Sequence, residues 1–185
     1  MAESTMIPEL ERHVVDSIRD SQNHFYGKYR GLVEEPDDST AEDGKRMGRI
    51  RATVPAVYGD SVKSPWAMPC VPFAGDSHGL VLLPEKGDGV WIEFECGDPA
   101  LPIWSGCWWG DNEMPDDGGV QKRALVTSKG LKLVFDDEAQ SIKLSHPGGA
   151  EVSVTSSTIT IKLSSRKIEI TTSAVSINDG ALEVR

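Results

Sequence analysis

The stretch 156–185, SSTITIKLSSRKIEITTSAVSINDGALEVR, alternates aliphatic and polar residues and restarts this alternation several times. Such alternation is typical of a β-strand with one apolar face and one face in water. The pattern begins earlier, and from Val152 onward pairs of aliphatic residues restart every seven to nine residues. The pairs are Leu131/Leu133, Ile142/Leu144, Val152/Val154, Ile159/Ile161, Ile168/Ile170, Val175/Ile177 and Leu182/Val184. The C-terminal part is therefore predicted to be an internal repeat of short strands.

The stretch 156–185 carries no helix or aromatic anchor against which its strands could pack. A single narrow ribbon of such strands would expose its apolar face to water, whereas three chains around one axis can point every aliphatic pair inward. Closure also removes long free edges at which strands aggregate. We therefore predict a short, intertwined, trimeric β-helix over residues 125–185. Its expected trimer core is Val152, Val154, Ile159, Ile161, Leu163, Ile168, Ile170, Val175 and Ile177.

Two other arrangements of the repeats stay open. One is an ordinary antiparallel sheet packed on the preceding domain. The other is a left-handed β-helix, which is disfavoured because a strict six-residue period is missing.

Residues 25–110 contain short strand candidates separated by proline, glycine and aspartate, with no helical periodicity among them. The candidates are FYGKYRGLVEE, RMGRIRATVPAVYG, AMPCVPF, GLVLLP, DGVWIEFE and LPIWSGCWWG. This spacing predicts a small Greek-key barrel such as the OB-fold. The polar segment 111–124 is expected to be a linker, so the fold class is mostly β.

Residues 1–24 are expected to form a helical arm. Leu10, Val14, Val15 and Ile18 recur at three- and four-residue spacings and so share one helical face. The arm is expected to pack either on its own domain or on a neighbouring subunit, and the sequence favours neither. The segment is acidic and lacks an apolar stretch of signal-peptide length, so we expect synthesis and assembly in the cytoplasm.

The charge balance of the chain restricts its partners. With 29 acidic and 19 basic residues, the net charge is −10. This sign disfavours nucleic acid, whose phosphates are bound through Lys and Arg, and it disfavours a polybasic grip on anionic lipid. No apolar run approaches the length of a transmembrane helix.

No residues suggest a metal, a cofactor or a reaction. Cys70, Cys96 and Cys107 fit no zinc motif and stand among apolar residues, so we expect buried free thiols. The histidines show no metal-ligand spacing. The tripeptide GDS occurs twice, without the flanking residues of a hydrolase nucleophile elbow. We therefore expect no enzyme activity.

Three motifs and the terminal repeats carry a family resemblance over about residues 25–185. The motifs are GRIRATVPAVYGD from Gly48, SPWAMPCVPFAG from Ser64 and GLVLLPEKGDGVWIEFECGDPALPIWSGCWWG from Gly79. With them the chain resembles the baseplate assembly protein V family of contractile-tailed phages and contractile injection systems. That family includes the type VI secretion spike known as valine-glycine repeat protein G.

The resemblance implies a homotrimeric, structural spike at the centre of a baseplate. OB-fold domains would form a collar under a hub protein, and the β-helix would be a needle driven into the target envelope when the sheath contracts. The target membrane would be met only mechanically, and the assembled protein would belong to a phage tail-like particle. Trp104, Trp108 and Trp109 are expected to be core or hub-interface residues. The last pair, Leu182 and Val184, leaves open apolar layers that a PAAR-type tip protein is expected to cover.

The chain departs from some family members in two respects. No lysozyme domain fits between barrel and needle, and the needle lacks a strict eight-residue Val-x-Gly repeat. An alternative function is an OB-fold carbohydrate-binding module, for which the tryptophans would supply stacking surfaces.

Overall fold

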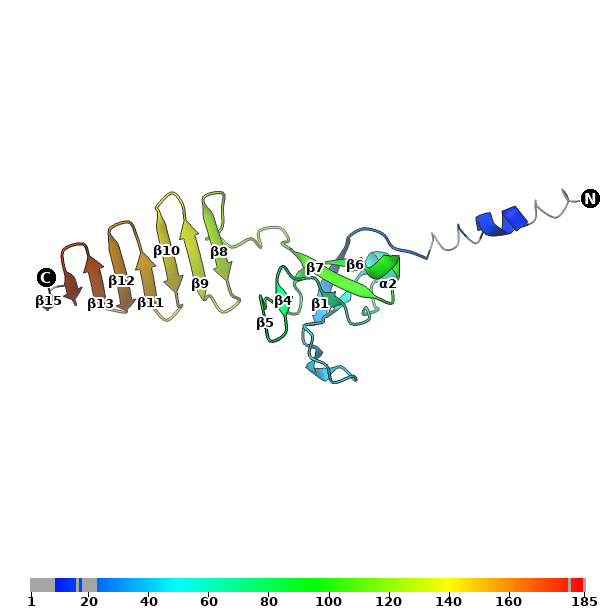
Figure 1. Cartoon of the computed structure of the whole chain (residues 1–185), viewed down its shortest axis with the longest axis horizontal. Helices are drawn as coiled ribbons and strands as arrows, with labels where there is room; N and C mark the ends of the chain where they lie inside the picture. The colour runs from blue at the N-terminus through cyan, green and yellow to red at the C-terminus, as the bar shows by residue number, and fades with distance from the viewer. Residues whose placement is uncertain (1–8, 16, 18–22, 180, 185) are drawn as a thin grey trace, which may run out of the picture. The chain divides into compact units, whose positions relative to one another are not determined.

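The computed structural model describes residues 9–15, 17, 23–179 and 181–184 and divides into two compact units, Met1–Asn112 and Glu113–Arg185 (Figure 1). Residues 9–15 and 17 are helical, as the arm prediction requires. Leu10, Val14 and Val15 are 49–66% exposed. Ile18 lies outside the described residues.

The first unit is a small barrel of short strands. Its elements are β1 (Tyr29–Glu35), η1 (Asp38–Thr40), β2 (Arg51–Thr53), α2 (Pro55–Tyr58), β3 (Met68–Pro69), β4 (Ala74–Gly75), β5 (His78–Gly79), β6 (Gly89–Phe94), η2 (Glu95–Gly97) and β7 (Pro102–Trp108). Five strands form a sheet in the order β2-β1-β6-β7-β3. Isolated bridges Ile50↔Ala67 and Thr53↔Lys63 join the β2 side to the segment before β3, so the sheet closes on itself. The OB-type barrel is confirmed.

The barrel encloses its own apolar core. Buried side chains from β1, β2, β6 and β7 meet there, and half-buried Phe25, Tyr29 and Tyr58 pack around them. The core consists of Val33, Ile50, Ala52, Val54, Ala67, Val90, Ile92, Phe94 and Trp104. The first unit therefore has the buried apolar surface that a self-sufficient domain needs.

The prediction that GLVLLP forms a strand is wrong. Only His78 and Gly79 pair, in the two-stranded hairpin of β4 and β5, and residues 80–84 carry no strand assignment. The reason is topological. Both edges of β6 are occupied, one by β1 and the other by β7, so the preceding segment cannot form a hairpin with β6.

The second unit is one antiparallel sheet. Its strands are β8 (Lys122–Val126), β9 (Lys132–Asp136), β10 (Ser141–Ser145), β11 (Ala150–Val154), β12 (Thr158–Leu163), β13 (Arg166–Thr171), β14 (Val175–Ile177) and β15 (Leu182–Val184). They follow the order β15-β14-β13-β12-β11-β10-β9-β8, so each strand pairs with its neighbours in sequence. The first strand begins at Lys122, within the segment expected to be a linker.

This order corrects one detail of the predicted β-helix. In intertwined chains, neighbouring strands of a sheet come from different subunits. Here the strands of one chain are hydrogen-bonded to one another, because turns of a few residues return each strand directly onto the preceding one. A chain therefore contributes a complete sheet.

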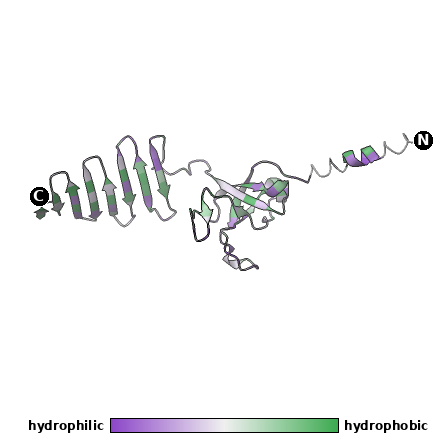
Figure 2. Ribbon diagram, in the orientation of Figure 1, coloured by the Kyte–Doolittle hydropathy of each residue, from purple (hydrophilic) through white to green (hydrophobic). Residues whose placement is uncertain are grey.

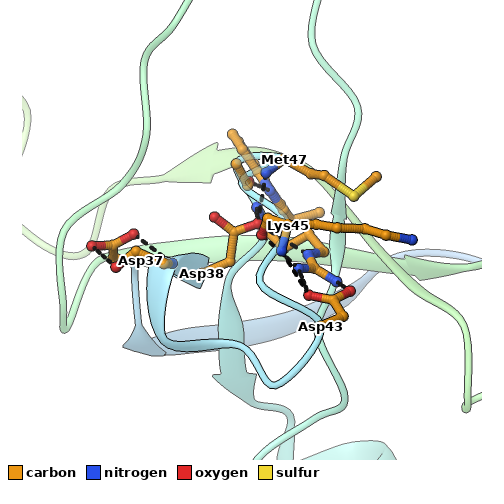
Figure 3. A network of polar contacts seen from close by, with 9 residues as sticks. Asp37, Asp38, Asp43, Lys45 and Met47 are labelled. Atoms are coloured by element: carbon orange, nitrogen blue, oxygen red, sulfur yellow. Dashed lines mark hydrogen bonds and ion pairs between the residues drawn. The ribbon is translucent and has the colours of Figure 1, made fainter.

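An ionic network folds the acidic segment after β1 back onto the barrel (Figure 3). The Asp38 carboxylate, 2% exposed, accepts hydrogen bonds from the N–H groups of Met47 and Arg49 at 2.8 and 3.2 Å and from Arg49 Nε at 3.0 Å. The Arg49 guanidinium also binds Asp43 bidentately, with both distances 2.8 Å. Arg49 Nη2 also donates to the carbonyl of Lys45 at 2.9 Å.

These contacts shift the titration of both aspartates. Burial alone would raise the pKa of Asp38, but hydrogen bonds from Met47 and Arg49 outweigh it and lower that pKa. The hydrogen bonds from the Arg49 side chain, and then that from the Lys45 N–H, hold the pKa of Asp43 far below its usual value. The charged forms of both carboxylates therefore belong to the folded state.

Acid is predicted to weaken the barrel through this network. Because the folded pKa values are depressed, the stabilisation is complete above the ordinary aspartate pKa, about 4, and is lost as the pH falls below it. We expect the thermal midpoint of the barrel transition to fall by several degrees over that range. Asp43→Asn should flatten the dependence, whereas an acid response identical in this variant and the native chain would contradict the assignment.

Candidate trimer interface

The strand register of the second unit aligns apolar side chains, all aliphatic except Phe135, in two rows on one face of the sheet. The first row is Phe135, Ile142, Val154, Ile159, Ile170, Val175 and Val184. The second row is Leu125, Leu133, Leu144, Val152, Ile161, Ile168, Ile177 and Leu182. A shift of one residue in any ladder would turn a strand's aliphatic side chains to the other face. Figure 2 shows the resulting alternation of hydropathy along the strands.

Threonine side chains fix two of the turns that set this register. The Thr155 hydroxyl accepts the N–H of Thr158 at 3.0 Å, and the Thr155 N–H bonds the Thr158 carbonyl at 2.9 Å. Thr171 and Ala174 make the same two contacts at 3.1 and 2.9 Å. Both turns lie between aliphatic pairs, so a polar residue at the start of each turn holds the next pair on the same face.

The opposite face is polar and carries ion pairs. Lys122 contacts Asp136 at 3.3 Å, and Lys143 contacts Glu151 at 2.7 Å. Each of these side chains is displaced by one or three residues from the aliphatic rows, which places it on the other face. The sheet therefore has one face suited to water and one that is not.

Among the described residues of the second unit, no segment covers the aliphatic face. Val152 and Val154 are 37% and 36% exposed, and Ile161 is 49% exposed. Complete burial of such a side chain contributes about 1.5–3 kcal/mol, so covering the exposed half of both rows contributes on the order of 10 kcal/mol per chain. Contiguous apolar patches of this size mark interaction surfaces.

Eight of the nine residues expected in the trimer core lie in these two rows. The exception is Leu163, which faces the same side but pairs with Ala150 and Arg166. It is 60% exposed and lies at the margin of the face. Leu182 and Val184, the expected tip contacts, are on the last strand and are 57% and 60% exposed.

The tryptophans of the barrel occupy different environments. Trp104 is 4% exposed, and its indole N–H donates to the carbonyl of Gly48 at 3.1 Å, so this residue belongs to the core and not to an interface. Trp108 is half-buried and donates to the Val90 carbonyl at 3.1 Å. The guanidinium of Arg30 lies 5.1 Å from its ring.

Other apolar side chains of the barrel are exposed to solvent. Trp109 is 64% exposed, and the run Leu80–Leu83 is 43–77% exposed along its whole length. The sequence pointed to Trp109 but not to this run, because four consecutive apolar residues suggest a buried strand. Residues 80–83 do not pair with β6, because β1 and β7 occupy both of its edges, and they lie at the surface.

The cysteine prediction is half right. All three thiols are free, but Cys70, Cys96 and Cys107 are exposed instead of buried. Cys96 lies between Glu95 and Gly97 in the 3-10 turn η2, outside the strands whose side chains form the core.

The described residues contain no group of three or more metal-binding side chains. Within that same part of the chain, no helix is long and apolar enough to cross a membrane. Phe25 and Tyr58 are the aromatic residues among those lining an open groove of the barrel, and the Tyr58 hydroxyl donates to the carbonyl of Pro99 at 2.6 Å. Nothing in this arrangement favours the carbohydrate-binding alternative.

Two family models match the two units. Residues 29–109 match the Type VI secretion system/phage-baseplate injector OB domain, and residues 122–183 match the Phage baseplate V C-terminal trimerisation domain. The chain belongs to the baseplate spike protein family. A search of curated proteins found no match.

Membership in the spike family accounts for the incomplete second unit. The trimerisation-domain match covers β8 through β14 and reaches into β15, the same strands that carry the uncovered aliphatic face. The spike protein is thus a homotrimeric structural component of a baseplate.

Charge placed on the aliphatic face is predicted to prevent trimerisation. In Ile161→Asp or Ile170→Asp, three carboxylates would meet inside one trimer, and we expect sedimentation equilibrium to give the mass of a monomer. Lys162→Asp changes the neighbouring residue on the other face and should leave the trimer mass unchanged. Equal effects of Ile161→Asp and Lys162→Asp would show that the two faces are assigned incorrectly.

Proposed function

We propose that this protein is the central spike of a contractile injection system or phage tail, joining the hub to the tip and piercing the target envelope when the sheath contracts. The observation that carries the proposal is the continuous aliphatic face of an eight-stranded sheet whose other face is polar. Three such faces turned toward one axis make a solid prism with a charged exterior. Its core consists of the two aliphatic rows, with Leu163 at their margin.

The geometry of the sheet suits axial load. In such a prism the strands run across the axis and the hydrogen bonds between them run along it. Neighbouring strands are about 4.8 Å apart, so the eight strands make a prism about 35 Å long. Compression along the axis then acts on a dense stack of ladder bonds and packed side chains, with no cavity or hinge needed for the work.

The hub contact is proposed on the exposed apolar surface of the barrel. Trp109 offers a large ring, Trp108 lies beside it in sequence, and Leu80–Leu83 offers a second apolar surface. Aromatic side chains of this kind are enriched at the energetic centre of interfaces.

The tip contact is proposed on the last strand. Leu182 and Val184 end the aliphatic rows, and no further strand follows β15 among the described residues. A PAAR-type protein seated there would cover the apolar end of the prism. The spike would be assembled in the cytoplasm and then become part of a phage tail-like particle, with no nucleic-acid partner and no reaction.

Variants that cannot form the trimer and variants that lose the tip contact are predicted to fail at different stages, the first in baseplate assembly and the second in piercing the target. Particles from cells producing Ile161→Asp should lack complete baseplates in electron micrographs. Val184→Asp should allow baseplates to form but reduce dye entry into target cells several-fold, because the tip is no longer seated. Lys162→Asp is the matched control and should resemble the native protein. Full dye entry with Val184→Asp would refute the tip assignment.

Hub binding is predicted to depend on Trp109. Trp109→Ser should lower co-purification of the hub protein by about tenfold or more, as expected for removal of a buried aromatic anchor. Lys86→Ser, a change on another exposed part of the barrel, should have little effect. If Trp109→Ser retains the hub fully, the contact lies elsewhere, and Val81→Lys tests the run Leu80–Leu83.

A further inference from the structure

One row of the aliphatic face begins with a charged residue. The register pairs Arg123 on β8 with Phe135 on β9, so Arg123 occupies the first place in the row that continues through Ile142. Asp137 follows Phe135 by two residues and therefore faces the same side. Its N–H bonds the carbonyl of Gln121 at 2.9 Å, which extends the ladder by one step.

The two charged side chains contact each other. Arg123 Nη1 donates to the Asp137 carboxylate, and in the single chain the side chains are 64% and 56% exposed. The ion pairs Lys122–Asp136 and Lys143–Glu151 lie on the polar face. Lys132 and Lys167, which form the other ion pairs described in this unit, also alternate with the aliphatic residues and face the polar side. The Arg123–Asp137 pair, by contrast, lies on the face covered in the trimer.

Trimer formation changes the environment of this pair. A layer of the prism consists of the inward residues of one strand from each of three chains, and Arg123 belongs to the layer of β8. Among the described residues of the two rows, every later position is apolar. Charges in such a place are tolerated only when they stay paired.

We propose that the Arg123–Asp137 pairs of three chains together form the first layer of the trimer as a closed charged layer. This layer would set the axial register of the three chains relative to one another. If one chain shifted by two strands, its Arg123 would lie level with Ile142 and Leu144 of its neighbours, away from their carboxylates. An unpaired charge among apolar side chains is costly, so the shifted trimer is disfavoured. A single buried polar position fixes register in coiled coils by the same physics.

The first experiment compares two neighbouring residues with the same change of charge. Arg123→Glu alters the inward face, and Lys122→Glu alters the outward face of the same strand. We expect Arg123→Glu to raise the concentration at which half of the chains are trimeric by about tenfold or more, and Lys122→Glu to change it less than about threefold. Adding Asp137→Arg to Arg123→Glu restores the pair and should restore the native value. Indistinguishable single variants, or no restoration, would overturn the proposal.

The second experiment measures register directly and remains informative if Arg123→Glu fails to fold. A spin label is attached at Lys162→Cys on the polar face, with Cys70, Cys96 and Cys107 replaced by serine. The native pair should give one narrow inter-label distance, as threefold symmetry requires. The apolar variant Arg123→Leu/Asp137→Leu should remain trimeric and show a second distance, from chains displaced by two strand spacings, about 9.5 Å. A single unchanged distance in that variant would overturn the role in register. Both measurements depend on the trimer and are independent of hub binding or piercing.

Discussion

The C-terminal unit depends on covering an aliphatic face that one chain leaves in water. Its backbone needs nothing further, since strands β8 to β15 satisfy one another's hydrogen bonds in sequence order. What is missing is apolar contact on one side. Identical chains supply it, because three copies of the same face can meet around an axis while the ion pairs of the polar face, such as Lys143–Glu151, stay outside. The association of identical chains follows from this requirement, and the match to a trimerisation domain indicates that three of them associate.

The barrel satisfies the same requirement within one chain. Its closed sheet surrounds Val33, Ile92 and Trp104, and the Arg49 network seals the acidic segment against it. The stability of this unit is intramolecular, whereas that of the needle depends on protein concentration. The spike thus joins a domain with its core enclosed in one chain to a domain whose apolar face is covered only when chains associate.

The sequence predicted the needle better than the barrel surface. Alternation at Ile159/Ile161 or Ile168/Ile170 reports directly which side of a strand is apolar, and the nine expected core residues share one face, eight of them in its two rows. Trp104 and Trp109 are both aromatic residues near the end of the barrel, yet one is buried and the other exposed. That difference depends on which face of β7 points inward and where the strand ends. Leu80–Leu83 does not pair with β6 because β1 and β7 already occupy both edges of that strand. Strand order is a property of the whole sheet and cannot be read from the local sequence. Consecutive pairing of the needle strands was likewise not apparent, since the spacing of aliphatic pairs suits intertwined and meandering chains alike.

Consecutive pairing also decides how the needle is made. Each strand finds its partner only a few residues away, so contacts are local and the entropy lost on closing each turn is small. Successive hairpins of this kind form on the microsecond scale, and the sheet can grow strand by strand from β8. No chain has to be threaded around another, and the three sheets meet as separately built parts. The slow step is then the encounter of chains, so the rate at which spikes appear follows the concentration of newly made protein.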